Sequence, residues 1–192
     1  MYRSIKILKY LLVVVLLLFS CEETNTPKPG GYLALTYPEP TYSMREFLAC
    51  PYAFEINQIA KIQPAKAKQN CWYNIEYPTL NATLFLSYRP VNKDNLRDLL
   101  VDAQRLPLEH TIKADEIEGD TYVNNKRKVY GTFYEVKGDA ASQAQFYVTD
   151  SVNHFLTGSL YFKTKPNFDS IQPAAAYLKK DMKRLLESLQ WR

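Results

Sequence analysis

An unbroken apolar run near the N-terminus decides which part of this chain can fold. Tyr10 to Phe19 is apolar throughout, and Arg3, Lys6 and Lys9 precede it. At ~1.5 Å per residue, such a run spans roughly 15 Å as a helix, about half of a ~30 Å hydrocarbon core, so it is too short to cross a bilayer. A basic stretch followed by a short apolar run is typical of a secretory signal peptide. Residues 1–20 are therefore predicted to be a signal peptide that takes no part in the fold.

The residues that close this run predict a lipid anchor. Leu18-Phe19-Ser20-Cys21 resembles the bacterial lipobox, in which an aliphatic and a small residue precede an obligatory cysteine. Cys21 becomes the first mature residue and receives diacylglycerol. Two or three acyl chains hold a protein firmly at a membrane, whereas one binds marginally. We expect lipidation at Cys21, with the membrane as a partner through the N-terminal lipid. The alternative is an uncleaved short anchor with an incidental cysteine.

The mature chain is predicted to be one domain on a tether. Residues 21–31 are polar and rich in proline and glycine, so they cannot bury enough apolar surface to order themselves. Residues 32–192 have a length that suits a single core. Three of the 24 Lys and Arg residues lie in the predicted signal peptide, which leaves residues 21–192 almost neutral, with 21 Lys and Arg against 20 Asp and Glu. No nucleic-acid partner is expected from such a balance.

An extracytoplasmic compartment changes how the other cysteines are interpreted. Cys50 and Cys71 enter an oxidising space as two thiols, which can form one disulfide; the alternative is two buried free cysteines. A metal site is not expected, because His110 and His154 are far apart in sequence and neither lies at ligand spacing from a cysteine. No cofactor motif is present either: the glycine pair Gly30-Gly31 lies in the tether and does not open a helix.

The hydrophobic pattern of the domain predicts an α+β fold. Period-two alternation and strand-forming residues indicate strands at Leu33–Tyr37, Phe54–Ile56, Ile59–Ile62, Cys71–Tyr77, Ala82–Tyr88, Val129–Val136, Gln143–Thr149 and His154–Phe162. Apolar stripes at three- and four-residue spacing indicate one helix from Asn92 or Asp94 to Leu106, ended or kinked by Pro107, and a second from Asp169 or Ser170 to Leu189. We expect an antiparallel sheet covered by two main helices, reminiscent of a Mog1/PsbP-like sandwich.

The chain offers little that resembles an active site. Asp115 to Asp120 is an acidic run that we interpret as a solvated loop. His154 follows the turn at Asp150 and Ser151, where a catalytic group is conceivable, but a histidine there more often hydrogen-bonds the turn. Tyrosines on the predicted strands share one face that is either a binding surface or core: Tyr130, Tyr134, Tyr147 and Tyr161.

Three segments of the C-terminal third carry a family resemblance: Tyr130-Gly131-Thr132-Phe133-Tyr134-Glu135-Val136, Ala140 through Ser151, and His154 through Phe162. With the closing stretch from Pro166 to Trp191 and the lipobox, they resemble the gliding-motility lipoprotein GldD family of Bacteroidetes. The resemblance implies an accessory cell-envelope lipoprotein, facing the periplasm, that is needed for gliding and for the linked type IX secretion system. It implies no catalytic activity. Expected partners are other gliding-motility lipoproteins and secretion or motor components.

We expect a scaffold role, in which the protein binds and stabilises other gliding lipoproteins or motor and secretion components. The expected interaction surface comprises Tyr134, Ala140, Ser142, Gln143, Tyr147, Asp150, His154 and Tyr161.

Two further hypotheses stand beside this scaffold role. The competing function is an envelope enzyme, with His154 and Asp150 as acid/base residues, or a glycan-binding module acting on cell-wall or surface polysaccharide. Asp150-Ser151-Val152 and Asp169-Ser170-Ile171 also resemble acceptor sites for periplasmic O-glycosylation, although both suit a turn or helix cap.

Overall fold

A computed structural model describes residues 36–66, 69–109, 113–164 and 168–192. The chain divides into two compact units, Met1–Gly31 and Tyr32–Arg192. The described residues all belong to the second unit. The predicted signal peptide, the predicted tether, Cys21 and His110 lie outside them.

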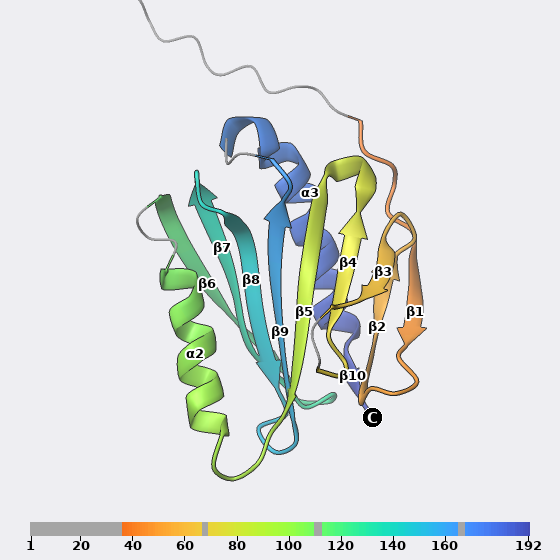
Figure 1. Cartoon of the computed structure of the whole chain (residues 1–192), viewed down its shortest axis with the longest axis vertical. Coiled ribbons are helices and arrows are strands. Elements are labelled where there is room, and N and C mark those ends of the chain that lie inside the picture. Colours follow the sequence, from red (N-terminus) through yellow and green to blue (C-terminus); the bar gives the residue numbers. More distant parts are fainter. Residues whose placement is uncertain (1–35, 67–68, 110–112, 165–167) are drawn as a thin grey trace, which may run out of the picture. The chain divides into compact units, whose positions relative to one another are not determined.

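A seven-stranded antiparallel sheet and a smaller three-stranded sheet form the frame of this unit (Figure 1). The large sheet has the order β3-β4-β5-β9-β8-β7-β6 and the small one the order β1-β2-β10. The strands are β1 (Tyr42–Glu46), β2 (Tyr52–Asn57), β3 (Lys61–Pro64), β4 (Tyr73–Tyr77), β5 (Ala82–Pro90), β6 (Ala114–Asn124), β7 (Val129–Gly138), β8 (Ser142–Thr149), β9 (His154–Phe162) and β10 (Gln190–Trp191). A 3-10 turn, η1 (Pro78–Leu80), joins β4 to β5.

Two long helices lie on opposite faces of the large sheet, α2 (Leu96–Leu108) and α3 (Phe168–Ser188) (Figure 1). Helix α2 ends one residue after Pro107, as a proline without a backbone N–H predicts. The α+β class, with an antiparallel sheet and two main helices, is thereby confirmed. No helix among the described residues is long and apolar enough to span a membrane.

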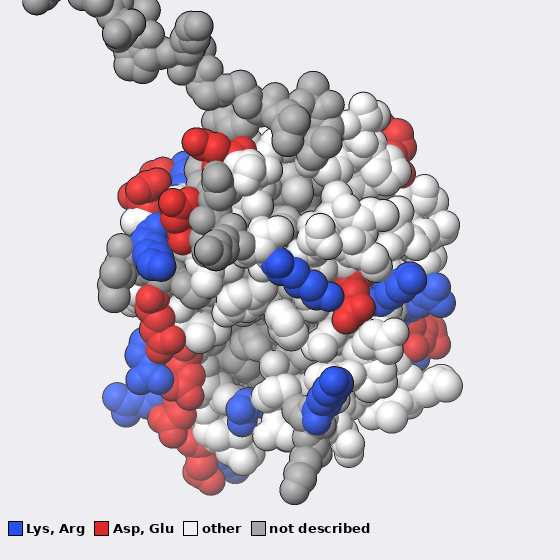
Figure 2. Space-filling view, turned by 45° about the horizontal axis from the view of Figure 1, so that its top comes forward, with Lys and Arg blue, Asp and Glu red and all other residues white. Residues whose placement is uncertain are grey.

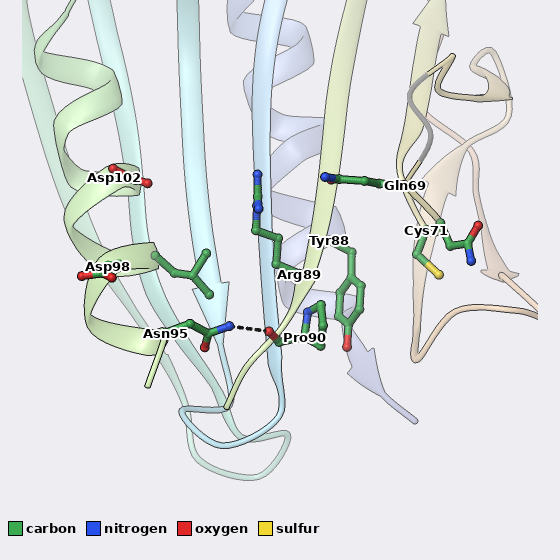
Figure 3. Close-up of a pocket in the computed structure, with 10 residues that line it drawn as sticks. Gln69, Cys71, Tyr88, Arg89, Pro90, Asn95, Asp98 and Asp102 are labelled. Carbon is green, nitrogen blue, oxygen red and sulfur yellow. Dashed lines mark hydrogen bonds between the residues drawn. The ribbon is translucent and has the colours of Figure 1, made fainter. Parts of the chain in front are cut away.

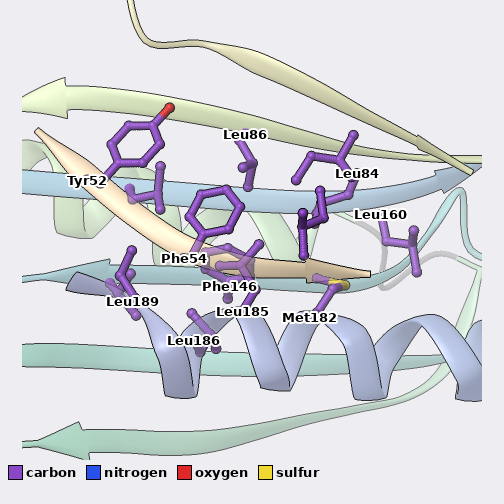
Figure 4. Close-up of a cluster of buried hydrophobic side chains, with 14 of the residues drawn as sticks. Tyr52, Phe54, Leu84, Leu86, Phe146, Leu160, Met182, Leu185, Leu186 and Leu189 are labelled. Carbon is purple, nitrogen blue, oxygen red and sulfur yellow. The ribbon is translucent and has the colours of Figure 1, made fainter. Parts of the chain in front are cut away.

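The main core lies between the large sheet, α3 and strand β2 (Figure 4). Alternate residues of each strand face it, so that Leu84 and Leu86 of β5 meet Phe146 of β8 and Leu160 of β9. The apolar stripe predicted for the second helix is buried throughout, by Leu178, Met182, Leu185 and Leu186 of α3 and by Leu189 just after its end. Strand β8 is buried along its whole length, because α3 covers one of its faces and α2 the other.

The strand predictions hold best where strands are buried. Those at Phe54–Ile56, Cys71–Tyr77, Ala82–Tyr88 and the last three runs correspond to β2, β4, β5, β7, β8 and β9. Of the predicted strand Leu33–Tyr37, only Thr36 and Tyr37 are described, and they are not in a strand.

The acidic run Asp115 to Asp120 is not a loop, which corrects the interpretation from sequence. It belongs to β6, an exposed edge strand paired with β7. Lys137 of β7 bridges Glu116 and Glu118 across this pair, at 2.7 and 3.0 Å. Charged side chains are common on edge strands, where they discourage pairing with other chains. They also break the alternation by which a strand is recognised.

Candidate functional site

Two adjoining hollows follow helix α2 across the sheet. One, of about 650 Å³, lies between the start of α2, the end of β5 and residues 69–71 (Figure 3). A second, of about 240 Å³, continues toward the end of α2 and shares Arg89, Leu99 and Asp102 with the first. We call the two together the α2 groove. In the space-filling view, charged side chains gather along the edge of the molecule where α2 and β6 lie, and much of the rest of the visible face carries uncharged residues (Figure 2).

Arg89 stands in the middle of the α2 groove. Its side chain comes from β5, and Figure 3 shows it between Asp98 and Asp102 on one side and Gln69 on the other. Its guanidinium carbon lies 5.6 Å from the ring centroid of Trp72, a cation–π contact. The Trp72 ring is itself fixed, because its Nε1 donates a 2.7 Å hydrogen bond to the carbonyl oxygen of Tyr88.

One wall of the groove is held by a disulfide. Cys71 is bonded to Cys50, which precedes β2, with the two Cα atoms 5.4 Å apart. The hydroxyl of Tyr52 donates to the Cys71 carbonyl oxygen at 2.8 Å, from a ring that is fully buried. Cys71 has a φ of 66°, a left-handed conformation that is unfavourable for a residue with a side chain unless its surroundings hold it. These contacts hold the backbone at Cys71, where it borders the groove.

The opposite wall is the first part of α2. Asn95, the residue before α2, donates from Nδ2 to the carbonyl oxygen of Pro90 at 3.0 Å, and so ties α2 to the end of β5. Asn92 Oδ1 accepts hydrogen bonds from the backbone N–H groups of Asp94 and Asn95, both at 2.9 Å. Pro107 is the buried residue of α2, and the apolar residues Leu99, Ala103 and Leu106 line the groove. The stripe predicted from sequence is thus only partly covered.

The predicted tyrosine face divides between core and surface. Tyr147 is buried: its ring stacks on Phe155, and its hydroxyl accepts hydrogen bonds from Gln104 of α2 and from Thr132 at 3.2 and 3.1 Å. Tyr134 is half-buried beside it, with ring centroids 6.4 Å apart. Tyr161 is also half-buried and lies edge-on to the exposed Phe85, at 5.7 Å. Burial raises the pKa of both Tyr134 and Tyr161.

Half of the predicted interaction surface is wrong, because its residues lie inside the protein. Tyr147 is one case; the small residues before and within β8 are the others, with Ala140 at 2 % exposure and both Ser142 and Gln143 at 0 %. Gln143 donates from Nε2 to the carbonyl oxygens of Gly138 and Ala140, at 3.1 and 3.0 Å. Ser142 donates to the carbonyl oxygen of Ala144. These side chains satisfy the backbone of a buried connection and have no surface to offer a partner.

The turn between β8 and β9 brings Asp150 and His154 together, and both side chains are engaged in contacts within the protein. Asp150 Oδ1 accepts hydrogen bonds from the backbone N–H groups of Val152, Asn153 and His154, between 2.8 and 3.0 Å. Partial burial favours the neutral acid, but these three donors prevail and lower the pKa of Asp150. His154 stacks on Trp191 at 5.1 Å, and its Nδ1 lies 3.0 Å from the hydroxyl of Tyr88. Burial lowers the pKa of His154, against the opposing effect of Asp150.

A second polar cluster, which the sequence did not predict, surrounds Asp181 of α3. Asp181 is 4 % exposed and accepts hydrogen bonds from the hydroxyl of Tyr42 and from Asn57 Nδ2, at 2.6 and 3.0 Å. Burial raises the pKa of Asp181, although the bonds from Tyr42, Asn57 and Tyr77 oppose that shift. Asn57 also donates to the hydroxyl of Tyr177, which donates in turn to the Pro38 carbonyl oxygen. The cluster ties the first described segment of the domain to α3.

The groove residues were missed because they come from distant parts of the sequence. Trp72, Arg89 and Leu99 meet only through the pairing of β4 with β5 and the return of α2 across the sheet. The sequence indicates an apolar stripe on α2, but its periodicity does not report how much of that stripe is buried. Within the described residues, no group of three or more His, Cys, Asp and Glu side chains is arranged to hold a metal ion.

Comparison with known proteins was made at the level of sequence family, curated proteins and solved structures. The search of curated proteins finds no match to this chain. Among solved structures, the chain is similar to the solution structure of cyanobacterial PsbP (CyanoP) from Synechocystis sp. PCC 6803, with a TM-score of 0.49 and 10% sequence identity over 85% of this chain and 98% of that one. The family model described as "gliding motility lipoprotein GldD" matches residues 22–191 of the 192 in the chain. The protein therefore belongs to the gliding motility lipoprotein GldD family.

Proposed function

We propose that this member of the family is a non-catalytic binding protein that supports gliding motility and the linked type IX secretion system from the cell envelope. The observation that carries the proposal is the α2 groove, whose walls are held by contacts that need no occupant. On one side stand the Cys50–Cys71 disulfide and the hydrogen bond from Tyr52; on the other, Asn95 ties α2 to β5. A preformed groove binds with little ordering cost.

The arrangement of Asp150 and His154 favours binding over catalysis. An acid/base pair needs a lone pair or proton that faces a substrate. Asp150 Oδ1 is occupied by three backbone donors, and the ring of His154 lies against Trp191 with one nitrogen next to the Tyr88 hydroxyl. These contacts hold the β8–β9 turn and the C-terminal strand in place. We therefore assign both residues a structural role.

The lipid anchor limits where such a protein acts. We propose lipidation at Cys21 and a periplasmic orientation of the domain. A tether of the length expected from the sequence would reach roughly 15 to 20 Å, so the domain would stay near the membrane that holds it. Its partners would then be components of the same envelope, namely other gliding-motility lipoproteins and the secretion or motor parts.

A charge placed in the groove tests the proposal in living cells. Ala103 lines the groove, whereas Val101 of the same helix is 54 % exposed and is not among the lining residues. Ala103→Glu should abolish or strongly reduce spreading of colonies and export of a type IX substrate, while Val101→Glu should leave both at wild-type levels. Equal protein amounts in the envelope and equal melting temperatures establish that both variants fold. Normal gliding and export by a folded Ala103→Glu variant would count against the proposal.

A photo-cross-linking residue at the same two positions identifies what enters the groove. With the cross-linker at position 103 in native cells, we expect attachment to gliding or secretion components that position 101 does not reach. If position 103 is attached only to polysaccharide, the glycan-binding alternative replaces a protein partner. Attachment of the same material at both positions would show that the groove is not the contact.

A further inference from the structure

The chemistry of the α2 groove indicates what kind of segment it accepts. The decisive residue is Arg89, whose side chain is exposed and lines both hollows of the groove. Three other arginines of the described residues pair with carboxylates, Arg105 with Asp102, Arg184 with Glu55 and Arg192 with Glu46, whereas Arg45, Arg97 and Arg127 form no such pair within that part of the chain. Within the described part of the chain, no carboxylate oxygen lies within 4.0 Å of the Arg89 guanidinium, although Asp98 and Asp102 border the same groove.

Arg89 is also held ready for a planar anion. The Trp72 ring lies against the guanidinium, and the bond from Trp72 Nε1 to Tyr88 keeps that ring in place. A guanidinium stacked on an aromatic ring keeps its N–H edge free, and that edge matches the two oxygens of a carboxylate. Because the Trp72 ring is fixed, contact with it reduces the side-chain entropy that Arg89 loses when a carboxylate binds.

The rest of the lining defines what accompanies the carboxylate. Beyond Arg89, the groove continues over the apolar residues Leu99, Ala103, Leu106 and Phe155, and the ion pair of Arg105 with Glu109 also borders it. From Leu99 to Leu106 the helix advances about 10 Å, which corresponds to about three residues of an extended chain. An apolar side chain next to the carboxylate would therefore lie on this surface. A ligand that is polar throughout would leave it uncovered.

The rim of the groove limits the total negative charge of a ligand. Asp98 and Asp102 are four residues apart on α2, so both carboxylates lie on one side of the helix, and both are exposed. Because Asp102 is already paired with Arg105 at 3.5 Å, Asp98 is the rim carboxylate that would repel a ligand with an anionic group at every repeat, such as a polyuronate, and attract a basic side chain. Charge complementarity thus favours one carboxylate at the floor, an apolar neighbour and a basic or neutral residue at the rim.

We propose that the α2 groove binds an extended peptide segment of a partner protein, in which an Asp or Glu side chain pairs with Arg89 and an adjacent apolar side chain packs on Leu99, Ala103 and Phe155. This inference rests on the proposed function and specifies the ligand of the same groove. The recognition combines one ion pair with an apolar contact, so affinity falls with salt and with loss of either group.

Peptide selection followed by titration tests this assignment. A library of random dodecapeptides displayed on phage is selected against the lipidated full chain in nanodiscs with its disulfide intact. Enriched peptides are then synthesised, and their affinities are measured by calorimetry against the wild type, Arg89→Gln and the matched control Arg97→Gln. Arg97 is an exposed residue of α2 outside the groove lining, so its change removes the same charge elsewhere.

The expected result is enrichment of peptides with an Asp or Glu beside an apolar residue. Arg89→Gln should weaken them at least about tenfold, and Arg97→Gln by less than twofold. Replacing the peptide carboxylate by its amide should weaken wild-type binding equally and have no further effect on Arg89→Gln. Enrichment without an acidic residue, or affinity unchanged by Arg89→Gln, would overturn the assignment, and so would oligogalacturonate binding in place of peptide.

The two proposals fail in different ways. If Ala103→Glu stops gliding but the selected peptides show no dependence on Arg89, the groove is a binding site and only the ligand assignment is wrong. If Ala103→Glu leaves gliding intact and no peptide is enriched, the groove itself is not the functional surface.

Discussion

Tyr147 lies flat on Phe155, with ring centroids 5.8 Å apart and an interplanar angle of 3°. The pair faces α2, since Gln104 of that helix donates to the Tyr147 hydroxyl and Phe155 also lines the α2 groove. Tyr147 therefore packs against a residue that lines the groove, Phe155. A change at Tyr147 acts on the groove through the stability of the fold, and not through a direct contact with a partner.

Loss of the Tyr147 ring should destabilise the domain strongly. Tyr147→Ala is expected to lower the free energy of unfolding by about 3 to 5 kcal/mol, because it leaves a cavity between α2 and the sheet. Tyr147→Phe should cost about 1 kcal/mol, since Gln104 and Thr132 lose their acceptor. Urea denaturation gives both values, and Tyr161→Ala, at a half-buried site, should cost less than Tyr147→Ala. A loss below 1 kcal/mol for Tyr147→Ala would contradict the burial described above.

Removal of the disulfide should weaken the fold and one wall of the groove together. Cys50 and Cys71 are 21 residues apart, and closing a loop of that length stabilises by roughly 3 kcal/mol in the chain-entropy model. The double variant Cys50→Ala, Cys71→Ala should lower the unfolding free energy by about that amount. Reducing agent should lower the unfolding free energy of the wild type and leave that of the variant unchanged. Equal sensitivity of both proteins to reducing agent would show that this disulfide is not the cause.

The raised pKa of Asp181 predicts a dependence of stability on pH. Its neutral form is favoured in the folded state, so its contribution is complete below the unfolded pKa of about 3.9 and is lost as pH rises through the folded value. The unfolding free energy of the wild type minus that of Asp181→Asn should therefore decrease as pH rises from 4 toward neutrality. Denaturant titrations of both proteins at several pH values give this difference. A difference that grows with pH would contradict burial as the dominant cause.

Asp150 should show the opposite dependence. The backbone N–H groups of Val152, Asn153 and His154 lower its pKa, so its stabilisation is present above the unfolded pKa and is lost as pH falls through the folded value. Asp150→Ala should cost about 1 to 2 kcal/mol at neutral pH, because the turn loses its acceptor. The cost should shrink in acid. Thermal unfolding of both proteins at neutral and acidic pH measures it, and an equal cost at both would refute this account.

A structural role for His154 predicts that its side chain is dispensable for activity. His154→Ala removes the stacking partner of Trp191 and the group beside the Tyr88 hydroxyl, so some stability should be lost. Gliding and type IX export should nevertheless stay at wild-type levels while the variant remains folded in the envelope. Loss of both functions by a well-folded His154→Ala variant would revive the enzyme hypothesis, in which His154 and Asp150 act as acid and base.

The buried strands could be predicted because their alternation reports burial directly. In β5 and β9, apolar residues at every second position meet α3 and β2, and the turn at Asp150 follows from side chains that bond local backbone. Strand β6 could not be found in this way. It lies at the edge of the sheet with both faces largely exposed, so its sequence lacks the apolar alternation and carries Asp115, Glu116, Glu118 and Asp120 instead.

The sequence by itself was enough to recognise the short apolar run before Cys21 and the family resemblance, and to predict the two amphipathic helices and the α+β class. Each depends on residues that are neighbours in the chain. Only the tertiary structure decided that Tyr147 is buried, that Asp181 is surrounded by tyrosines, and that Trp72, Arg89 and α2 border one groove. Alternation reports which residues share a face of a strand, but which element covers that face depends on long-range pairing, which local patterns do not record.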